Sequence, residues 1–397
     1  AIIDVALAGS DEYDRTWDAV WNVGIAFNEN GWTAEFQFPF SMFQYDNEPN
    51  MLWGISFERM IHRLQETVEW PGKEKFVPVM MLPLGVLKGL SSIPNKNQLE
   101  LAPYLLAGGS DGLDIDLGID ARYGLTSKTI MKVTFNPDFG QVEADPSVLN
   151  LTAFETFYEE KRPFFSEGSD FFSQRINLFN SRRIGKRPNF YIPEEGEING
   201  LSNYTTILGA TKIMGSTTSN INYGIISAIT KEESATIDDT LSPQKIIVEP
   251  RTNYSIGRFE FPVLNTISKI GIMGTNVIRE NAEGSNVIGG DWNLSLLNNR
   301  LFSNGQIIRS NVNNILGNAF RFNIGYLNSD WWSARIWFGT SDDKFDINDL
   351  GFIRRNNITW TGARLALRRQ EPWGHFVNNN LEFKYTQDWN GSGLALE

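Results

Sequence analysis

The chain has 397 residues, of which 35 are Lys or Arg and 47 are Asp or Glu, so its net charge at pH 7 is −12. It contains no cysteine, which excludes a disulfide scaffold, a cysteine-ligated metal site and a thiol enzyme. The acidic balance argues against nucleic acid as a partner, because that surface requires clustered Lys and Arg. Hydrophobic residues make up 41% of the chain, yet its mean hydropathy is −0.28, so apolar and polar residues are finely interleaved. Such interleaving indicates β-structure.

The segment 1–72 predicts a small β-sandwich domain, because three runs alternate apolar and polar residues with a period of two. The runs extend from Trp21 to Phe27, from Trp32 to Phe40 and from Trp53 to Phe57, and they place Trp32 and Trp53 on the core-facing side. Asn30-Gly31 between the first two runs is typical of a hairpin turn. The following stretch, 73–97, contains Pro, Gly and Ser and predicts a linker.

From residue 98 to 397 the chain consists of alternating segments, each about ten residues long, which is the span of a tilted transmembrane strand. Clear examples are Ile288–Leu296, Phe320–Tyr326 and Leu381–Tyr385, with one apolar and one polar face. No run of about eighteen apolar residues exists, so a membrane-spanning helix is excluded.

Alternation alone does not distinguish a soluble sandwich from a barrel. Tryptophans beside turn residues favour the barrel, because tryptophan is enriched at both membrane interfaces. These are Trp331, Trp332, Trp360, Trp373 and Trp389. The predicted fold is therefore all-β: a partial N-terminal β-sandwich followed by a transmembrane antiparallel β-barrel of roughly a dozen strands.

The alternation breaks between Asn136 and Gly200, where charged residues of both signs are dense. We interpret 136–200 as a charged loop or plug inserted into the barrel, in which acids and bases pair because buried charges need partners. The residues of this predicted lumen network are Asp138, Glu143, Asp145, Glu155, Glu160, Lys161, Arg162, Arg182 and Arg183.

Several motifs resemble those of a known family. The stretch from Asn136 to Gly185 and the segment Asp346–Phe352 are similar to the hallmark motifs of a domain family of unknown function found in Gram-negative outer-membrane proteins. The segments Trp17–Trp21, Gly31–Phe36 and Pro39–Ser41 resemble the latter half of a carbohydrate-binding module of family 9. The resemblance implies a module whose early strands precede Ala1, and an outer-membrane location. It implies no mechanism.

Residues of this sequence could instead form a catalytic site, a metal site or a sugar-binding site. Paired carboxylates of a glycoside hydrolase must lie about 5–9.5 Å apart across a cleft, which sequence spacing does not show. Oxygens of Asp138, Glu143 and Asp145 suit calcium, but no EF-hand spacing is present. His62 and His375 lie in different domains without cysteine nearby, which argues against a zinc site. We therefore assign no catalytic residue and no cofactor, with calcium as the alternative.

Sugar binding is the third candidate, because aromatic rings stack on apolar sugar faces while polar side chains bond the hydroxyls. Trp70, Arg59, Arg63 and Glu66 cluster after the third run and are the predicted carbohydrate-binding residues. Trp70 lies outside the alternation and is the predicted exposed platform.

These observations favour a non-catalytic outer-membrane protein that binds or passes a glycan-containing ligand, with its N-terminal domain in the periplasm. Its partners would be outer-membrane lipid, a glycan and other outer-membrane proteins. The alternative is a structural subunit of a larger outer-membrane complex, in which the sandwich is a docking module. A glycan hydrolase is the weaker alternative.

Overall fold

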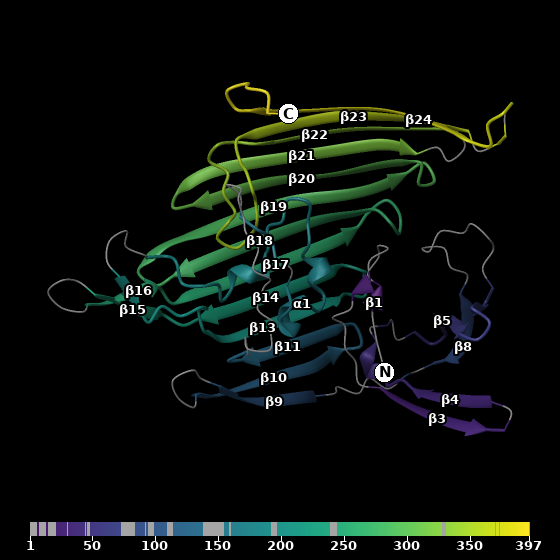
Figure 1. Ribbon diagram of the computed structural model, residues 1–397, viewed down its shortest axis with the longest axis horizontal. Coiled ribbons are helices and arrows are strands. Elements are labelled where there is room, and N and C mark those ends of the chain that lie inside the picture. The colour runs from purple at the N-terminus through teal and green to yellow at the C-terminus, as the bar shows by residue number, and fades with distance from the viewer. Residues whose placement is uncertain are drawn as a thin grey trace. The chain divides into compact units, whose positions relative to one another are not determined.

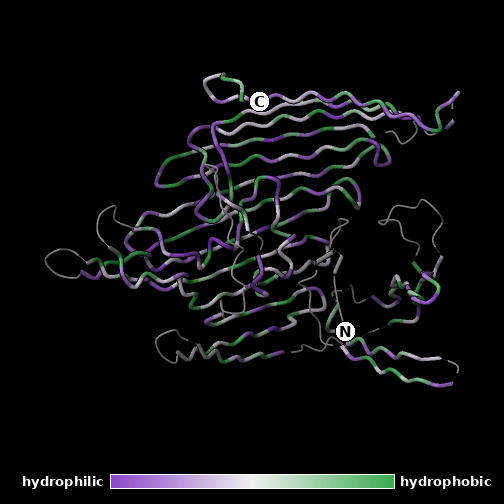
Figure 2. Tube along the Cα trace, viewed as in Figure 1, coloured by the Kyte–Doolittle hydropathy of each residue, from purple (hydrophilic) through white to green (hydrophobic). Residues whose placement is uncertain are grey.

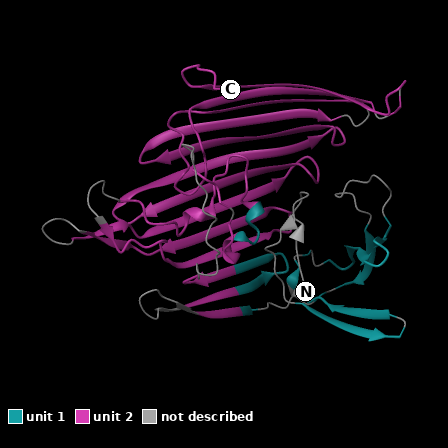
Figure 3. Ribbon diagram, in the orientation of Figure 1, with its two compact units in different colours: residues 1–100, 122–131, 166–170 teal, residues 101–121, 132–165, 171–397 magenta. Residues whose placement is uncertain are grey.

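The computed structural model describes residues 6–7, 13–14, 21–29, 31–43, 45, 48–72, 84–91, 93, 99–108, 114–137, 155–158, 160–191, 197–238, 244–327, 331–369, 371–372 and 374–396 (Figure 1). Its chain divides into two compact units (Figure 3). Unit 1 comprises Ala1–Glu100, Arg122–Met131 and Ser166–Asp170, and unit 2 comprises Leu101–Ala121, Lys132–Phe165 and Phe171–Glu397.

The N-terminal part of unit 1 consists of short strands paired two by two. The pairs are β1 (Ala6–Leu7) with β2 (Tyr13–Asp14), β3 (Asn22–Asn28) with β4 (Gly31–Gln37), β5 (Met51–Ile55) with β8 (Gly85–Leu90), and β6 (Phe57–Ile61) with β7 (Glu66–Trp70), while η1 (Phe40–Met42) follows β4. The predicted third run therefore reaches across two strands with different partners. β8 lies in the segment 73–97 that the sequence predicts as a linker.

Aromatic side chains hold this part of unit 1 together. Trp53 is half-buried, and its ring lies 5.2–5.8 Å from those of Phe40, Phe43 and Tyr45. Trp32 differs from the expectation, because it is 47% exposed and carries the guanidinium of Arg59 at 4.9 Å from its ring centroid. A hairpin of two strands has no second layer of its own to cover both faces, so its alternation does not guarantee burial.

One 13-stranded antiparallel sheet dominates the molecule (Figure 1). In chain order its strands are β9 (Leu99–Gly108), β10 (Asp114–Thr126), β11 (Thr129–Phe135), β13 (Ile207–Ser216), β14 (Asn222–Thr230), β17 (Thr252–Pro262), β18 (Lys269–Arg279), β19 (Ala282–Leu296), β20 (Leu301–Val312), β21 (Ile315–Leu327), β22 (Trp332–Ser341), β23 (Ile358–Arg369) and β24 (Asn379–Asn390). A separate three-stranded sheet contains β12 (Glu197–Asn199), β15 (Glu233–Asp238) and β16 (Gln244–Glu249).

Tight asparagine turns set the register of the central strands. The β18–β19 hairpin turns at Asn281, and the β20–β21 hairpin turns at Asn313 and Asn314, all with positive φ. Asparagine tolerates this left-handed conformation better than other side chains with a β-carbon. Turns this short fix the pairing register of the strands they join. In this register Asn286 lies directly opposite Asn311.

The two faces of the sheet differ in chemistry, and the alternation is visible along the strands in Figure 2. We call inner the face that carries the buried side chains of Ile226, Ile256 and Met273, and outer the opposite face. Ile225 and Ile272, each next to an inner residue in sequence, are 44% and 51% exposed on the outer face. Adjacent residues in a strand point to opposite faces, so the period of two produces this contrast directly.

The core of unit 2 lies on the inner face, where two connecting segments pack. The first, which we call the insertion, runs from residue 155 to 191 and contains α1 (Pro163–Ser166), η3 (Ser169–Phe171) and η4 (Ser181–Arg183). The second connects β22 to β23 and is called the 342–357 segment. The insertion contributes Phe164, Phe165, Phe172, Leu178, Phe179 and Ile184, and the 342–357 segment contributes Phe345, Ile347 and Leu350.

The structure confirms an all-β fold with one large antiparallel sheet. β9 and β24 stand at the two ends of the strand order, and in the described part of the chain no backbone pairing joins them. None of the described helices is long and apolar enough to cross a membrane.

Candidate functional site: the charged insertion on the inner face

The Glu160–Arg162 ion pair connects two parts of the insertion that are about twenty residues apart in sequence. The Arg162 side chain donates to Glu160 through Nε at 2.8 Å and Nη2 at 2.6 Å, and the Ser181 hydroxyl donates to the same carboxylate at 2.6 Å. Arg162 also donates to the carbonyl oxygens of Ser181 and Ile184 at 2.6 and 2.7 Å. This one guanidinium therefore ties the start of the insertion to η4.

Glu160 is held ionised by its surroundings. Burial by itself would raise its pKa, but the hydrogen bonds and positive charge of Arg162, with the Ser181 hydroxyl, lower the pKa below its ordinary value. The side chains of Arg162 and Glu160 are only 7% and 9% exposed, so solvent screens their attraction little.

Arg183 joins the insertion to the 342–357 segment. Its two terminal nitrogens donate to the two carboxylate oxygens of Glu155 at 2.7 Å each, while Nε donates to the carbonyl of Gly351 at 3.1 Å. The backbone continues the contact, because Asn180 N–H donates to the carbonyl of Leu350 at 2.7 Å. The bidentate geometry fixes both position and orientation of the guanidinium.

A second buried node lies where β18, β16 and the 342–357 segment meet. Arg279 of β18 donates to both carboxylate oxygens of Asp349 at 2.8 and 3.0 Å. Glu249, at the end of β16 and 2% exposed, accepts from the backbone N–H groups of Asn189 and Phe190 at 3.1 Å each.

The pKa of Lys186 depends on its burial and on the charged side chains around it. Burial lowers its pKa most, the charges of Glu249 and Asp349 raise it, and Arg183 and Arg279 lower it, for a net decrease. Burial would raise the pKa of Asp349, but the hydrogen bonds and charge of Arg279 outweigh it, with smaller contributions from Ser285 and Lys186, and lower that pKa.

A third node lies on the inner face itself. Arg258 of β17 donates to Asp291 of β19 at 2.9 and 3.2 Å and to Glu260 at 2.9 Å. Gln174 of the insertion donates to the same Asp291 carboxylate at 2.6 Å. Phe171 covers the guanidinium, whose central carbon lies 5.6 Å from the ring centroid. The Arg258–Asp291 ion pair of the sheet is therefore also contacted by Gln174 and Phe171 of the insertion.

The structure brings together part of the predicted network. It pairs Glu160 with Arg162 and Glu155 with Arg183, whereas Asp138, Glu143 and Asp145 lie outside the described residues. Lys161 is exposed, and its backbone N–H donates to Glu160 at 3.0 Å. Arg182 is half-buried, and its backbone N–H donates to Asn180 at 3.3 Å.

Sequence patterns did not indicate the partners outside the insertion, which are Arg258 and Arg279 of the large sheet, Glu249 of β16 and Asp349 of the 342–357 segment. Arg258 does carry a local signal, because it follows inner-face residues Tyr254 and Ile256 at a spacing of two. A charge at such a position must find a buried partner. Its partner Asp291 lies 33 positions away, which no local pattern reveals.

Glu160 and Glu155 of the insertion do not suit acid catalysis. A glycosidase needs one carboxylic acid with a raised pKa, whereas the Glu160 pKa is lowered and Glu155 is held by a guanidinium. Within the described residues, no group of three His, Asp or Glu side chains is arranged to hold a metal ion. The three residues considered for calcium fall outside that part of the chain.

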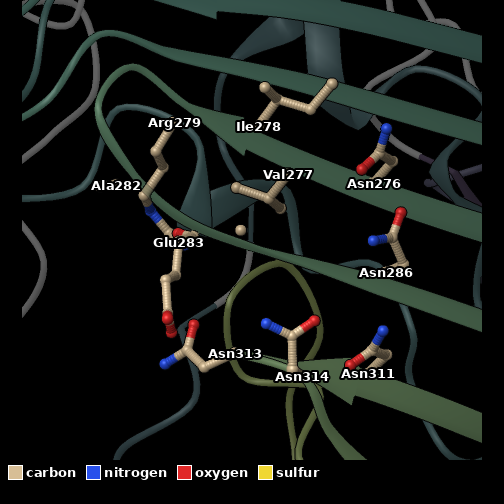
Figure 4. Close-up of a pocket in the computed structure, with 11 residues that line it drawn as sticks. Asn276, Val277, Ile278, Arg279, Ala282, Glu283, Asn286, Asn311, Asn313 and Asn314 are labelled. Carbon is tan, nitrogen blue, oxygen red and sulfur yellow. The ribbon is translucent and has the colours of Figure 1, made fainter.

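An asparagine-lined pocket of about 270 Å³ lies at the turn ends of β18, β19 and β20 (Figure 4). Asn276 lies opposite Asn286, and Asn286 lies opposite Asn311, so the three amides form a ladder across the strands. Asn313 and Asn314 of the β20–β21 turn complete the polar wall. The buried Oδ1 of Asn311 has no hydrogen-bond partner in the described structure. Amides in this arrangement offer donors and acceptors to sugar hydroxyls.

The predicted sugar-binding residues lie on the β6–β7 hairpin of unit 1. Register places Phe57 opposite Trp70, Arg59 opposite Val68 and Ile61 opposite Glu66, so Trp70, Arg59 and Glu66 share one face. Arg63 lies in the turn between the strands. Trp70 is 54% exposed, and its ring centroid lies 6.0 Å from that of Phe57.

Comparison with models of known protein families gives a match over most of the chain. Residues 98–393 match the family model described as Domain of unknown function (DUF5916). A search of proteins with curated function finds no match. The matched residues include the 13-stranded sheet from β9 to β24, the insertion and the 342–357 segment. Because the match spans well over half of the chain, this protein belongs to the DUF5916 family.

Proposed function

We propose that this protein is a bacterial outer-membrane β-barrel that binds or passes a glycan-containing ligand without catalysing a reaction on it. The observation that carries the proposal is the outer face of the sheet. Ile288, Ile307, Ile336 and Phe383, on four different strands, are 59%, 60%, 55% and 56% exposed. A water-soluble monomer rarely exposes large apolar side chains on so many neighbouring strands of one sheet face, whereas a lipid-facing wall requires them.

Membrane insertion also calls for closure of the sheet. Unpaired N–H and C=O groups at an edge are costly in hydrocarbon, so only helices and closed barrels span a bilayer. We therefore propose that the free edges of β9 and β24 are both paired in the membrane. The inner face would then enclose the insertion, whose ion pairs are screened from lipid.

Antiparallel order assigns the connections to the two ends of such a barrel. Counting from β9, the insertion, the β15–β16 excursion and the 342–357 segment all leave the sheet at the same end. With the N-terminal domain in the periplasm, that end is extracellular. Outer-membrane barrels commonly have short periplasmic turns and longer external connections, which agrees with this orientation.

Glycan binding is supported by two surfaces with suitable chemistry. The exposed ring of Trp70 lies on the same hairpin face as Arg59 and Glu66. The asparagine ladder lies at the proposed extracellular end. The lowered pKa of Glu160 and its pairing with Arg162 favour a non-catalytic role for the insertion over glycan hydrolysis.

The absence of cysteine makes a topology experiment direct. Thr266→Cys lies in the β17–β18 turn, and Glu280→Cys lies in the β18–β19 turn at the opposite end of β18. In intact cells, a membrane-impermeant maleimide should label Glu280→Cys and leave Thr266→Cys unlabelled until the outer membrane is permeabilised.

Both variants should sediment with the outer membrane and resist extraction by carbonate. Recovery in a soluble fraction, or equal labelling of both positions in intact cells, would refute the proposal. Purification from native membranes tests the alternative of a structural subunit, since stoichiometric co-elution of other outer-membrane proteins would favour a docking role for the N-terminal domain.

A further inference from the structure

A row of positive charges crosses the inner face near the C-terminal edge of the sheet. Register places Arg335 of β22 directly opposite Arg364 of β23, and Arg364 directly opposite Lys384 of β24. Arg321 of β21 lies on the same face, opposite Gly339 of β22. Like charges at directly opposed positions destabilise a sheet, so this arrangement costs stability unless something offsets it.

The described part of the protein offsets this charge only in part. Arg364 pairs with Glu382 at 2.7 Å, and Asp388 is a second acid on this face. Arg335 donates through Nε to the neutral amide of Asn323 at 2.6 Å. In contrast to the three nodes described above, no described carboxylate forms an ion pair with Arg321 or Arg335.

The insertion adds a further positive charge here. Ile176 N–H donates to the side chain of Gln306 at 2.8 Å, and Gln306 lies directly opposite Arg321. This contact brings the neighbouring Arg175 close enough that its charge repels those of Arg321 and Arg335. The chain as a whole carries −12, so a local excess of cations is not a consequence of composition.

Two tryptophan side chains lie on the same face as these cations. Trp337 packs over Gly362 of the opposite strand, and Trp360 packs over Gly339, each ring occupying the space where a β-carbon would stand. Glycine at both positions lets the indoles lie against the sheet. Both tryptophans are half-buried, and the guanidinium carbon of Arg335 lies 5.6 Å from the ring of Trp337.

The core of unit 2 does not extend to this part of the face. Its last member on the sheet is Ala319 of β21, and no described residue of β22, β23 or β24 belongs to it. The arginines and tryptophans therefore lie outside the apolar core that the insertion forms with the sheet.

We propose that the inner face of β21–β24 binds an acidic oligosaccharide, with Arg321 and Arg335 holding its anionic group and Trp337 and Trp360 stacking on its sugar rings. The proposal rests on charge complementarity, because arginines without carboxylate partners can bind anions. A planar guanidinium forms two hydrogen bonds with a carboxylate or sulfate group. The inference rests on the proposed function and names the chemical class of its glycan.

The test is calorimetric titration of the full-length protein in detergent micelles. The probes are a galacturonate tetramer, its fully methyl-esterified form, a heparin-derived tetrasaccharide and inorganic phosphate. We expect at least one acidic oligosaccharide to bind, with an affinity that falls as salt rises, and the ester and phosphate to bind at least tenfold more weakly.

Variants assign the binding to this face. Arg321→Gln and Arg335→Gln should each weaken binding about tenfold, because each removes a charge-assisted contact. Arg309→Gln is the matched control, because it removes the same charge from the outer face of β20 and should leave binding unchanged. Trp360→Leu should weaken binding of the acidic oligosaccharide and leave binding of phosphate unchanged.

The outcomes separate the two proposals. The acidic specificity is wrong if the methyl ester binds as tightly as the galacturonate tetramer, or if Arg309→Gln abolishes binding and Arg321→Gln does not. Either result would still be compatible with glycan binding. Phosphate binding as tight as the oligosaccharides overturns the saccharide part. Binding of neither acidic oligosaccharide overturns the inference, whereas the outer-membrane location is judged independently by cysteine labelling.

Discussion

Arg279 and Asp349 are 70 positions apart, yet their side chains form a bidentate pair in which Arg279 is 5% exposed. Arg279→Met should therefore lower the free energy of unfolding by about 3 kcal/mol, because it leaves a carboxylate in a poorly solvated site without its partner. Urea titration in micelles, followed by tryptophan fluorescence, measures this loss.

The double variant Arg279→Met/Asp349→Leu is the matched control. Replacing both partners by apolar residues removes the uncompensated charge, so stability should return to within about 1 kcal/mol of the wild type. A double variant no more stable than the single one would mean that packing around Arg279, and not its charge, accounts for the loss.

Glu160 makes part of the stability depend on pH. Its pKa in the folded protein is lowered, so the pair's contribution is complete above the unfolded value of about 4.3 and is lost as the pH falls through the lower folded value. Glu160→Gln should be less stable than the wild type at pH 7, and the difference should shrink below about pH 4. Unfolding curves across this range test it, and a constant difference down to pH 2 would contradict it.

At the scale of the strand, replacing an apolar residue by lysine should have a large cost on one exposed surface and a small cost on another. Ile307 lies near the middle of β20 on the outer face and is 60% exposed, while Leu264 in the β17–β18 turn is 77% exposed. If the outer face meets hydrocarbon, Ile307→Lys should cost about 2–4 kcal/mol in phospholipid bilayers. Leu264→Lys should cost no more than about 0.5 kcal/mol, as at most solvated sites.

Folding titrations of the two variants in vesicles measure both costs. A soluble protein would show little change for either substitution, because both side chains are exposed to water already. Equal, small effects in the two positions would therefore count against a lipid-facing sheet.

At the scale of the molecule, the insertion determines whether the proposed barrel would conduct. Phe165, Phe172 and Leu178 of the insertion pack against Ile256 and Met273 of the inner face, which fills space that an open pore would leave to water. Vesicles that contain the protein should therefore swell in an isotonic sugar solution no faster than empty vesicles. Flotation of protein with the vesicles controls for insertion, and rapid swelling would contradict a filled barrel.

The strands of unit 2 are predictable from sequence because the direction of a side chain in a strand depends only on its own pleat. Alternation over Ile288–Leu296, Phe320–Tyr326 and Leu381–Tyr385 predicted segments that lie in β19, β21 and β24. The Glu160–Arg162 contact is equally local, since its partners are two residues apart. In unit 1 the same alternation predicted burial of Trp32 and was wrong, because a two-stranded hairpin does not cover both its faces.

The sequence by itself determined an all-β chain with a charged interruption, because period, turn residues and composition are local properties. Only the tertiary structure decided which charges meet. Arg258 reaches Asp291 because β17 and β19 flank β18, and Arg335 faces Arg364 because the register of β22 and β23 aligns them. Register fixes each cross-strand neighbour, and a shift of one residue would change every pair, so local patterns do not specify these contacts.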